Sequence, residues 1–274
     1  MDEVPLAGGN TGGAVLANGT VRRRAGPWTP TVHSLLKFLE TSGFEGAPRA
    51  LGFDEKGREV LSFLQGETVG DTIPWPAWVH SDAALVDVGR WLRRYHDVVV
   101  HFEVPGDAQW RTAPSAERRP GDVIGHNDAA PYNAVWRSDV ASRSTAEEQT
   151  SRLIGFIDWD FAAPCPAIWD LAFLACAWVP LHAREVALRE GFTDFDGRPR
   201  RLRLLLDSYG YDGTIGELLE TVQARLEDHI RATEELARAG DPIFQHLIDD
   251  GVITRIERAI VELAHDAPEF DGAG

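Results

Sequence analysis

The chain has few of the residues that a cross-linked or a nucleic-acid-binding protein needs. Its 274 residues include two cysteines, Cys165 and Cys176, so a disulfide framework and a four-cysteine metal site are both excluded. Lysine and arginine number 27 against 43 acidic residues, and the net charge of -16 excludes the basic face that binds a nucleic-acid backbone. This charge would attract a cationic small molecule, although a solvated acidic surface is the simpler interpretation.

Long apolar runs are also missing. The most apolar stretch, Ala167 to His182, contains Asp170 and is too short and too polar to span a bilayer. The N-terminal sequence Met-Asp-Glu-Val-Pro has neither the basic nor the apolar segment of a signal peptide. We therefore expect no membrane segment, a cytoplasmic protein and no nucleic-acid partner, while the oligomeric state is left open.

The first part of the chain alternates strand and turn signals. Asn18-Gly19 lies between the strand-like runs 14–17 and 20–23, which predicts a hairpin. Apolar residues at helix spacing then predict a helix from Val32 to Thr41. A second strand pair, 51–53 and 60–64, is expected around the turn at Gly57. These signals together indicate a small sheet with one helix.

The rest of the chain is mainly helical in pattern. Helical spacing begins at Ala83, and amphipathic helices are expected beyond Pro180. Between them, a short β segment from Val123 to Ile157 is interrupted by residues 138–152, a Ser/Thr/Glu-rich tract that we expect to be a solvated loop.

Two short segments within that β region carry the candidate chemistry. His126 to Asn133 fits the pattern H-x-D-x-x-x-x-N, and Ile157-Asp158-Trp159-Asp160 follows a strand later. Phosphoryl transfer needs a carboxylate that orients the attacking hydroxyl and hard oxygen ligands that place magnesium on the phosphates. Asp128 fits the first role, and Asn133 with Asp158 fits the second. Chance would give the first pattern in roughly a few per cent of chains of this length.

Two neighbouring residues, Asp160 and His126, have other expected roles. Asp160 should share a face with Asp158 because alternate residues of a strand point the same way, and it could assist the metal or hydrogen-bond the backbone of the site. His126 is expected to be structural, since an imidazole beside a tight loop more often binds backbone carbonyls than transfers protons.

These motifs resemble those of the aminoglycoside phosphotransferase and choline kinase-like family of small-molecule kinases. Weaker similarities are spread along the chain: residues 92–96 resemble a helix end of the family, 60–66 its interlobe hinge, and 169–172 its Asp-Leu-Ala segment. The resemblance implies an α+β, bilobal, protein-kinase-like fold. Residues 1–65 would form a small nucleotide-binding lobe with a β-sheet and one helix, and residues 66–274 a larger, mainly helical catalytic and substrate-binding lobe.

The resemblance also implies roles for single residues. Asp128 would be the catalytic aspartate, Asn133 and Asp158 would bind Mg2+, and Asp170 would brace the catalytic loop from a helix start, where an ordinary N-cap is the alternative. ATP would place its adenine against the backbone of Ser62 to Leu64. The acceptor would be a hydroxyl of a small molecule, an aminoglycoside-like antibiotic or a metabolite.

The N-terminal part departs from the family pattern. Gly9, Asn10 and Gly12 belong to a glycine cluster that could bind ATP phosphates through backbone N–H groups or simply form a flexible turn. Arg22 best matches the family's phosphate-binding cation, and strand alternation places Arg23 on the opposite face.

The helix that follows lacks the glutamate with which the family pairs this cation, and His33 lies near the expected position. An ion pair is therefore expected to be missing. This favours, as the alternative function, a weak or inactive pseudokinase that acts as a nucleotide-binding or toxin-binding, immunity-type protein.

Overall fold

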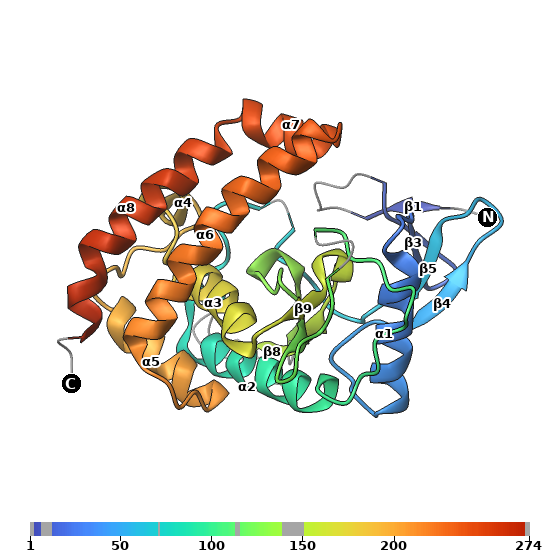
Figure 1. The fold of residues 1–274 in the computed structure, drawn as a ribbon, viewed down its shortest axis with the longest axis horizontal. Coiled ribbons are helices and arrows are strands. Elements are labelled where there is room, and N and C mark those ends of the chain that lie inside the picture. The colour runs from blue at the N-terminus through green and yellow to red at the C-terminus, as the bar shows by residue number, and fades with distance from the viewer. Residues whose placement is uncertain (1–2, 7–12, 71, 113–115, 139–150, 272–274) are drawn as a thin grey trace. The chain divides into compact units, whose positions relative to one another are not determined.

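The computed structural model describes residues 3–6, 13–70, 72–112, 116–138 and 151–271 (Figure 1). By compactness the chain divides into two units. The first consists of Met1–Asp71 and Trp91–Ala167, and the second of Thr72–Arg90 and Ile168–Gly274. The lobe boundary that sequence places between residues 65 and 66 remains a prediction.

An antiparallel sheet of five strands lies in the first unit, in the order β1-β2-β3-β5-β4. The strands are β1 (Val4–Pro5), β2 (Val15–Ala17), β3 (Thr20–Arg23), β4 (Ala50–Phe53) and β5 (Glu59–Ser62). The hairpin predicted at Asn18-Gly19 is confirmed: both residues have positive φ angles, 52° and 72°, as the tightest hairpin turns require.

Helix α1 (Thr29–Thr41) follows the hairpin, and it begins earlier than the sequence pattern suggested. Pro30 lies at the first helical positions, where a proline removes no intrahelical hydrogen bond. Val32, Leu35, Leu36 and Leu39 are at most 1% exposed, so the apolar stripe read from sequence is the buried face.

The rest of the first unit contains two short antiparallel sheets in place of the single β segment that we expected. Strand β6 (Val123–Gly125) pairs with β9 (Ala163–Cys165), and β7 (Ala134–Ser138) pairs with β8 (Ser151–Phe156). The first residue and the last two residues of the predicted loop at 138–152 therefore belong to strands. Residues 139–150 lie outside the described part of the chain.

Aromatic packing fixes the loops that carry the candidate site. Helix α2 (Asp82–Val99) places Trp91 4.5 Å from Phe156 and Tyr95 5.1 Å from Trp159, measured between ring centroids. The Tyr95 hydroxyl donates to the Ile124 carbonyl at 2.5 Å, and the Trp91 indole donates to the backbone at 3.1 Å. These buried rings tie α2 to the strands that precede the two candidate segments.

Gly155 allows two backbones to approach beside this cluster. A Cβ there would lie 2.2 Å from the carbonyl oxygen of Gly46, which accepts from the amide of Phe156. We expect Gly155→Ala to lower the free energy of unfolding by about 1–3 kcal/mol, the usual cost of overpacking. Urea unfolding would measure the change. Gly106→Ala is the matched control because a Cβ at Gly106 meets no atom within 4 Å, and an equal loss in both variants would contradict this explanation.

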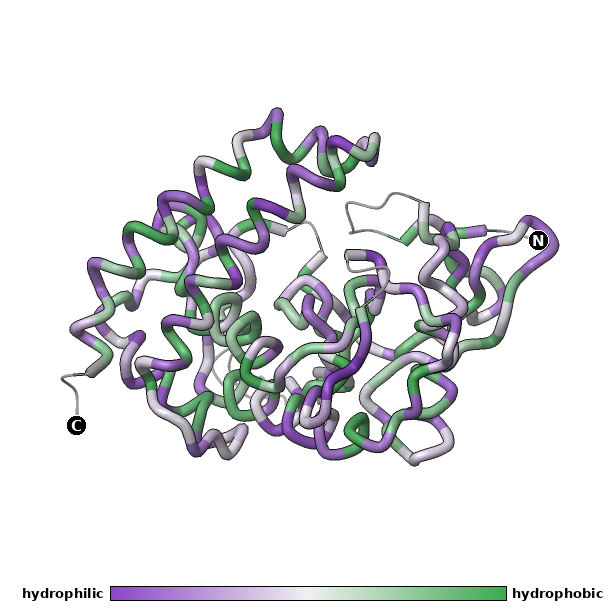
Figure 2. The backbone as a smooth tube through the Cα atoms, viewed as in Figure 1, coloured by the Kyte–Doolittle hydropathy of each residue, from purple (hydrophilic) through white to green (hydrophobic). Residues whose placement is uncertain are grey.

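Helices form the described part of the second unit after residue 168, as the sequence predicts beyond Pro180. They are α3 (Ala167–Trp178), α4 (Arg184–Arg189), α5 (Arg198–Tyr209), α6 (Ile215–Arg238), α7 (Pro242–Asp249) and α8 (Val252–Asp271). Helix α6 packs against α7 and α8, and hydrophilic and hydrophobic residues alternate along it (Figures 1 and 2). Thr214 and Glu217 form a capping box at its start. Among the described helices, none has the length and apolar character to cross a membrane.

Candidate active site

The first candidate segment, residues 126–133, is a tight loop after β6. Its residue Asn127 has a left-handed backbone (φ 62°) and donates to the carbonyls of Gly125 and Phe161 at 3.3 and 3.2 Å. His126 is fully buried, and its Nδ1 accepts from the amide of Asp128 at 3.3 Å. Its Nε2 therefore carries the proton and donates to the Ile157 carbonyl at 3.2 Å. The histidine thus joins the two candidate segments through backbone groups.

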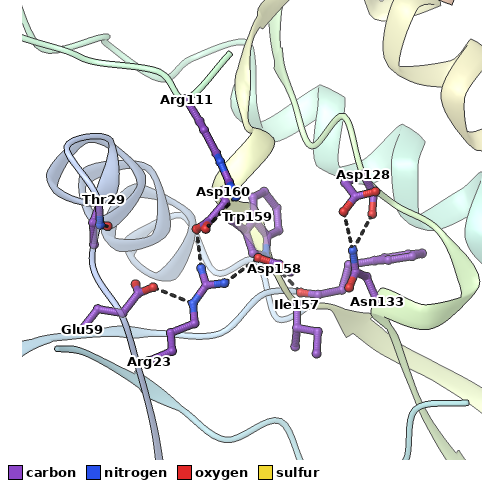
Figure 3. Close-up of polar contacts among 12 residues, drawn as sticks. Arg23, Thr29, Glu59, Arg111, Asp128, Asn133, Ile157, Asp158, Trp159 and Asp160 are labelled. Carbon is purple, nitrogen blue, oxygen red and sulfur yellow. Dashed lines mark hydrogen bonds and ion pairs between the residues drawn. The ribbon is translucent and has the colours of Figure 1, made fainter. Parts of the chain in front are cut away.

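Asp128 and Asn133 meet within this loop. The 3-10 turn η2 (Pro131–Asn133) returns Asn133 so that its Nδ2 donates to the backbone oxygen of Asp128 at 2.9 Å and to Oδ2 at 2.8 Å (Figure 3). The side-chain oxygen of Asn133 therefore faces away from the carboxylate. The Tyr132 hydroxyl donates to the other carboxylate oxygen, Oδ1, at 2.8 Å.

The sequence suggested a strand for the second candidate segment, residues 157–160, but the structure does not form one there. Strand β8 ends at Phe156, Asp158 has a left-handed backbone (φ 62°), and Asp160 lies in the 3-10 turn η3 (Trp159–Phe161). Positive φ at a residue that is not glycine is strained and is common at functional sites. The amide of Ile157 donates to the Asn133 carbonyl at 2.9 Å, which brings this segment beside the loop that carries Asp128.

Arg23 connects the sheet to both aspartates. Its two Nη atoms each lie 2.5 Å from a carboxylate oxygen, Nη1 from Asp158 Oδ1 and Nη2 from Asp160 Oδ1 (Figure 3). Its Nε forms an ion pair at 2.5 Å with Glu59, whose carboxylate is 1% exposed and lies 3.1 Å from the Nε2 of His33. One guanidinium thus holds three carboxylates from two separate parts of the chain.

The charges in this cluster act on one another strongly. Burial alone lowers the pKa of the Arg23 guanidinium, but Asp160, Asp158 and Glu59 together raise it above its ordinary value. Burial raises the pKa of Asp160, and the charge of Arg23 opposes that rise. Arg23 is therefore a permanent cation at the centre of the carboxylates.

Arg23, and not Arg22, is the arginine that reaches the site. Arg22 lies on the opposite face of β3, and its guanidinium is 3.8 Å from Asp54. The ion pair that sequence indicated as missing is supplied by a strand: Glu59 lies directly opposite Arg23 in the pairing of β3 with β5. The sequence signal was the opposite charge of the two residues, but their register could not be known before the strands were paired.

Arg111 is a further cation that the sequence argument missed. Its guanidinium lies between the rings of Trp28 and Phe161, 4.8 and 4.9 Å from their centroids, and its Nη1 is 3.5 Å from Asp160 Oδ2. Two guanidiniums therefore hold Asp160, whereas Asp158 contacts one. An isolated arginine far from any motif carries no signal in the sequence.

The donor set fits a magnesium ion that is shared with phosphates. The Asn133 side-chain oxygen and Asp158 Oδ2 accept no hydrogen bond from the described residues, and both are hard oxygen ligands. The described residues contain no group of three His, Cys, Asp or Glu side chains arranged to hold a metal. Magnesium usually binds to one or two protein oxygens and completes its shell with substrate phosphates and water.

The remaining predicted residues lie as follows. Gly9, Asn10 and Gly12 are outside the described residues. Ser62 is the last residue of β5, and its amide donates to the backbone carbonyl of Arg49 while its hydroxyl oxygen accepts from the Arg49 amide. Leu64 follows the end of this strand and is half-buried. Asp170 is buried in the first turn of α3, in the second unit.

One curated protein shares clear sequence similarity with the chain. The trifolitoxin immunity protein of Rhizobium leguminosarum bv. trifolii is 39% identical over 212 residues, which covers 76% of this chain and 74% of that protein. No family model matches the sequence.

Solved structures share the fold. The GDP complex of aminoglycoside 2'-phosphotransferase IIIa has a TM-score of 0.54 at 16% identity, over 97% of this chain and 93% of that one. A choline/ethanolamine kinase family protein from Mesorhizobium loti also scores 0.54, at 14% identity over 99% and 92% of the two chains. Spectinomycin phosphotransferase with ADP and spectinomycin scores 0.54 at 11% identity, over 98% and 93%. The predicted α+β, kinase-like fold is confirmed.

Proposed function

The chain belongs to the family of the trifolitoxin immunity protein, and we propose that it is a phosphotransferase that moves the γ-phosphate of ATP to a hydroxyl of a small molecule. One observation carries this proposal. Asp128 is fixed by Asn133 beside the segment that carries Asp158, so the carboxylate for a hydroxyl and the oxygens for a metal lie in one unit. A binding protein would not require this combination.

Each residue would have a distinct role. Asp128 would orient the acceptor hydroxyl and accept its proton. The Asn133 and Asp158 oxygens would hold magnesium, whose charge neutralises the phosphates when it is bound. Arg23, an arginine with planar N–H donors, would contact the phosphates, and its ion pairs would position it before the nucleotide arrives.

The similar structures support a nucleotide and a polyhydroxylated or amino-alcohol acceptor. One of them is a complex with GDP, and another is a complex with ADP and spectinomycin. The net charge of -16 is compatible with a cationic acceptor. We propose a cytoplasmic location because both cysteines are free thiols.

Nucleotide binding provides the first test. We expect ATP with magnesium to raise the melting temperature, because a ligand that binds only the folded state stabilises it. Asn133→Ala should reduce this shift, and magnesium-free ATP should produce a smaller one. Isothermal titration calorimetry at millimolar ATP and magnesium is the direct measurement, and absence of binding there would exclude the proposal. Gly106→Ala, at an exposed turn, is the control that should retain the full shift.

Toxin immunity without transfer is the second candidate function. The 39% identity to a protein named for immunity to trifolitoxin favours it. A trifolitoxin-sensitive strain that expresses this chain would survive the toxin if immunity is shared. Survival that persists in an Asp128→Asn variant would indicate protection by binding, and survival that is lost in this variant would indicate protection by phosphorylation.

A further inference from the structure

The Tyr132 hydroxyl occupies the position in which an acceptor hydroxyl would meet Asp128. It donates to Asp128 Oδ1 at 2.8 Å, while Asn133 holds Oδ2 at the same distance. A general base must lie within about 2.6–3.2 Å of the oxygen whose proton it takes. Tyr132 satisfies that condition.

Tyr132 is also accessible. The η2 turn buries Pro131 and Asn133 on either side of it and leaves Tyr132 48% exposed. The other tyrosine hydroxyls with assigned bonds contact carbonyls: Tyr95 donates to Ile124 and Tyr211 to Thr214, at 2.5 and 3.4 Å. A carbonyl cannot take a proton from an attacking hydroxyl. Tyr132, in contrast, donates to a carboxylate, which is a potential base.

We propose that Tyr132 is a self-phosphorylation site, an inference that rests on the proposed function. The phenolic oxygen would form a bond to the γ-phosphorus of ATP while the bond from that phosphorus to the β,γ-bridging oxygen breaks and ADP leaves. The phenolic proton passes to Asp128 Oδ1. Tyr132 reacts when no acceptor has displaced it from Asp128.

Phosphorylation would then remove the contact that permitted it. The phosphate adds about two negative charges beside the Asp128 carboxylate, and repulsion between like charges would move Tyr132 away. The modified loop would present Asp128 in a negatively charged environment that disfavours anionic acceptors.

Mass spectrometry tests the proposal on the full chain. Incubation with ATP and magnesium without acceptor should place phosphate on the peptide that contains Tyr132 and none on that of Tyr211. Tyr132→Phe should abolish the modification, and Asp128→Asn should slow it by roughly two to four orders of magnitude. The initial rate per molecule should not depend on protein concentration, because Tyr132 and Asp128 share one loop.

A second readout needs no nucleotide. With 3-fluorotyrosine incorporated, Asp128→Asn should shift the fluorine resonance of Tyr132, assigned from Tyr132→Phe, and leave that of Tyr211 in place. If the chemical shift of the Tyr132 fluorine is the same in the wild type and in Asp128→Asn, the proposal is wrong. An unmodified Tyr132 in protein that phosphorylates an acceptor would also overturn it, a result that leaves the proposed function intact. Absence of nucleotide binding would overturn both.

Discussion

Asp128→Asn is expected to reduce turnover by roughly two to four orders of magnitude, the scale of a lost general base. The amide keeps the shape of the side chain but cannot accept a proton from the attacking hydroxyl. Nucleotide affinity should be nearly unchanged, because the Asp128 carboxylate is assigned neither to the metal nor to the phosphates. It accepts hydrogen bonds from Tyr132 and Asn133. Coupled ADP-release assays, run once an acceptor is found among aminoglycosides, macrolides, choline and amino alcohols, would measure turnover.

Asp158→Asn is the informative comparison. A metal ligand acts before and during transfer, so this change should weaken magnesium-dependent nucleotide binding and the rate together. It also removes one of the charges paired with Arg23. An Asp128→Asn variant that retains full activity beside an active wild type would show that the general base has been assigned to the wrong residue.

Local rules are enough to predict most of the fold. The Asn18-Gly19 turn and the apolar stripe of α1 are both contained within short segments, and the structure reproduces them. The ends of the elements were less predictable. The apolar pattern begins at Val32, whereas α1 begins at Thr29, with a proline in its first turn. The separation of β6 and β9 from β7 and β8 depends on pairings between distant strands, which periodicity does not encode.

The candidate site also contains residues whose proximity could be predicted from a short segment and residues whose proximity could not. Asp128 and Asn133 belong to one loop, so their spacing in sequence was sufficient to predict that they meet. The choice between Arg22 and Arg23 depended on which face of β3 points to the aspartates, and alternation separates the faces without naming the inner one. Glu59 could be found only from the register of β3 and β5. Long-range pairing is the information that the motif lacked.

Arg23→Met is expected to cost about 3–5 kcal/mol of unfolding free energy, because it removes the cation that Glu59, Asp158 and Asp160 share and leaves Arg111 as the arginine beside Asp160. Glu59 is 1% exposed and the Asp160 side chain 9%, so neither is well solvated. Methionine keeps much of the side-chain length and adds no charge. Chemical denaturation at neutral pH would measure the loss, with circular dichroism as a check that the native fold is retained.

The neighbouring arginine is the matched control for this prediction. Arg22 lies on the same strand, but its ion pair with Asp54 is longer, at 3.8 Å, and more exposed, so Arg22→Met should cost no more than about 1 kcal/mol. The loss of unfolding free energy in Arg23→Lys should lie between those of the two methionine variants. An ammonium group keeps the charge but cannot reproduce the planar arrangement that contacts three carboxylates. Adding Glu59→Gln to Arg23→Met should recover part of the loss by removing one unpaired charge. Equal costs for Arg22→Met and Arg23→Met would show that the buried cluster does not depend on its central cation.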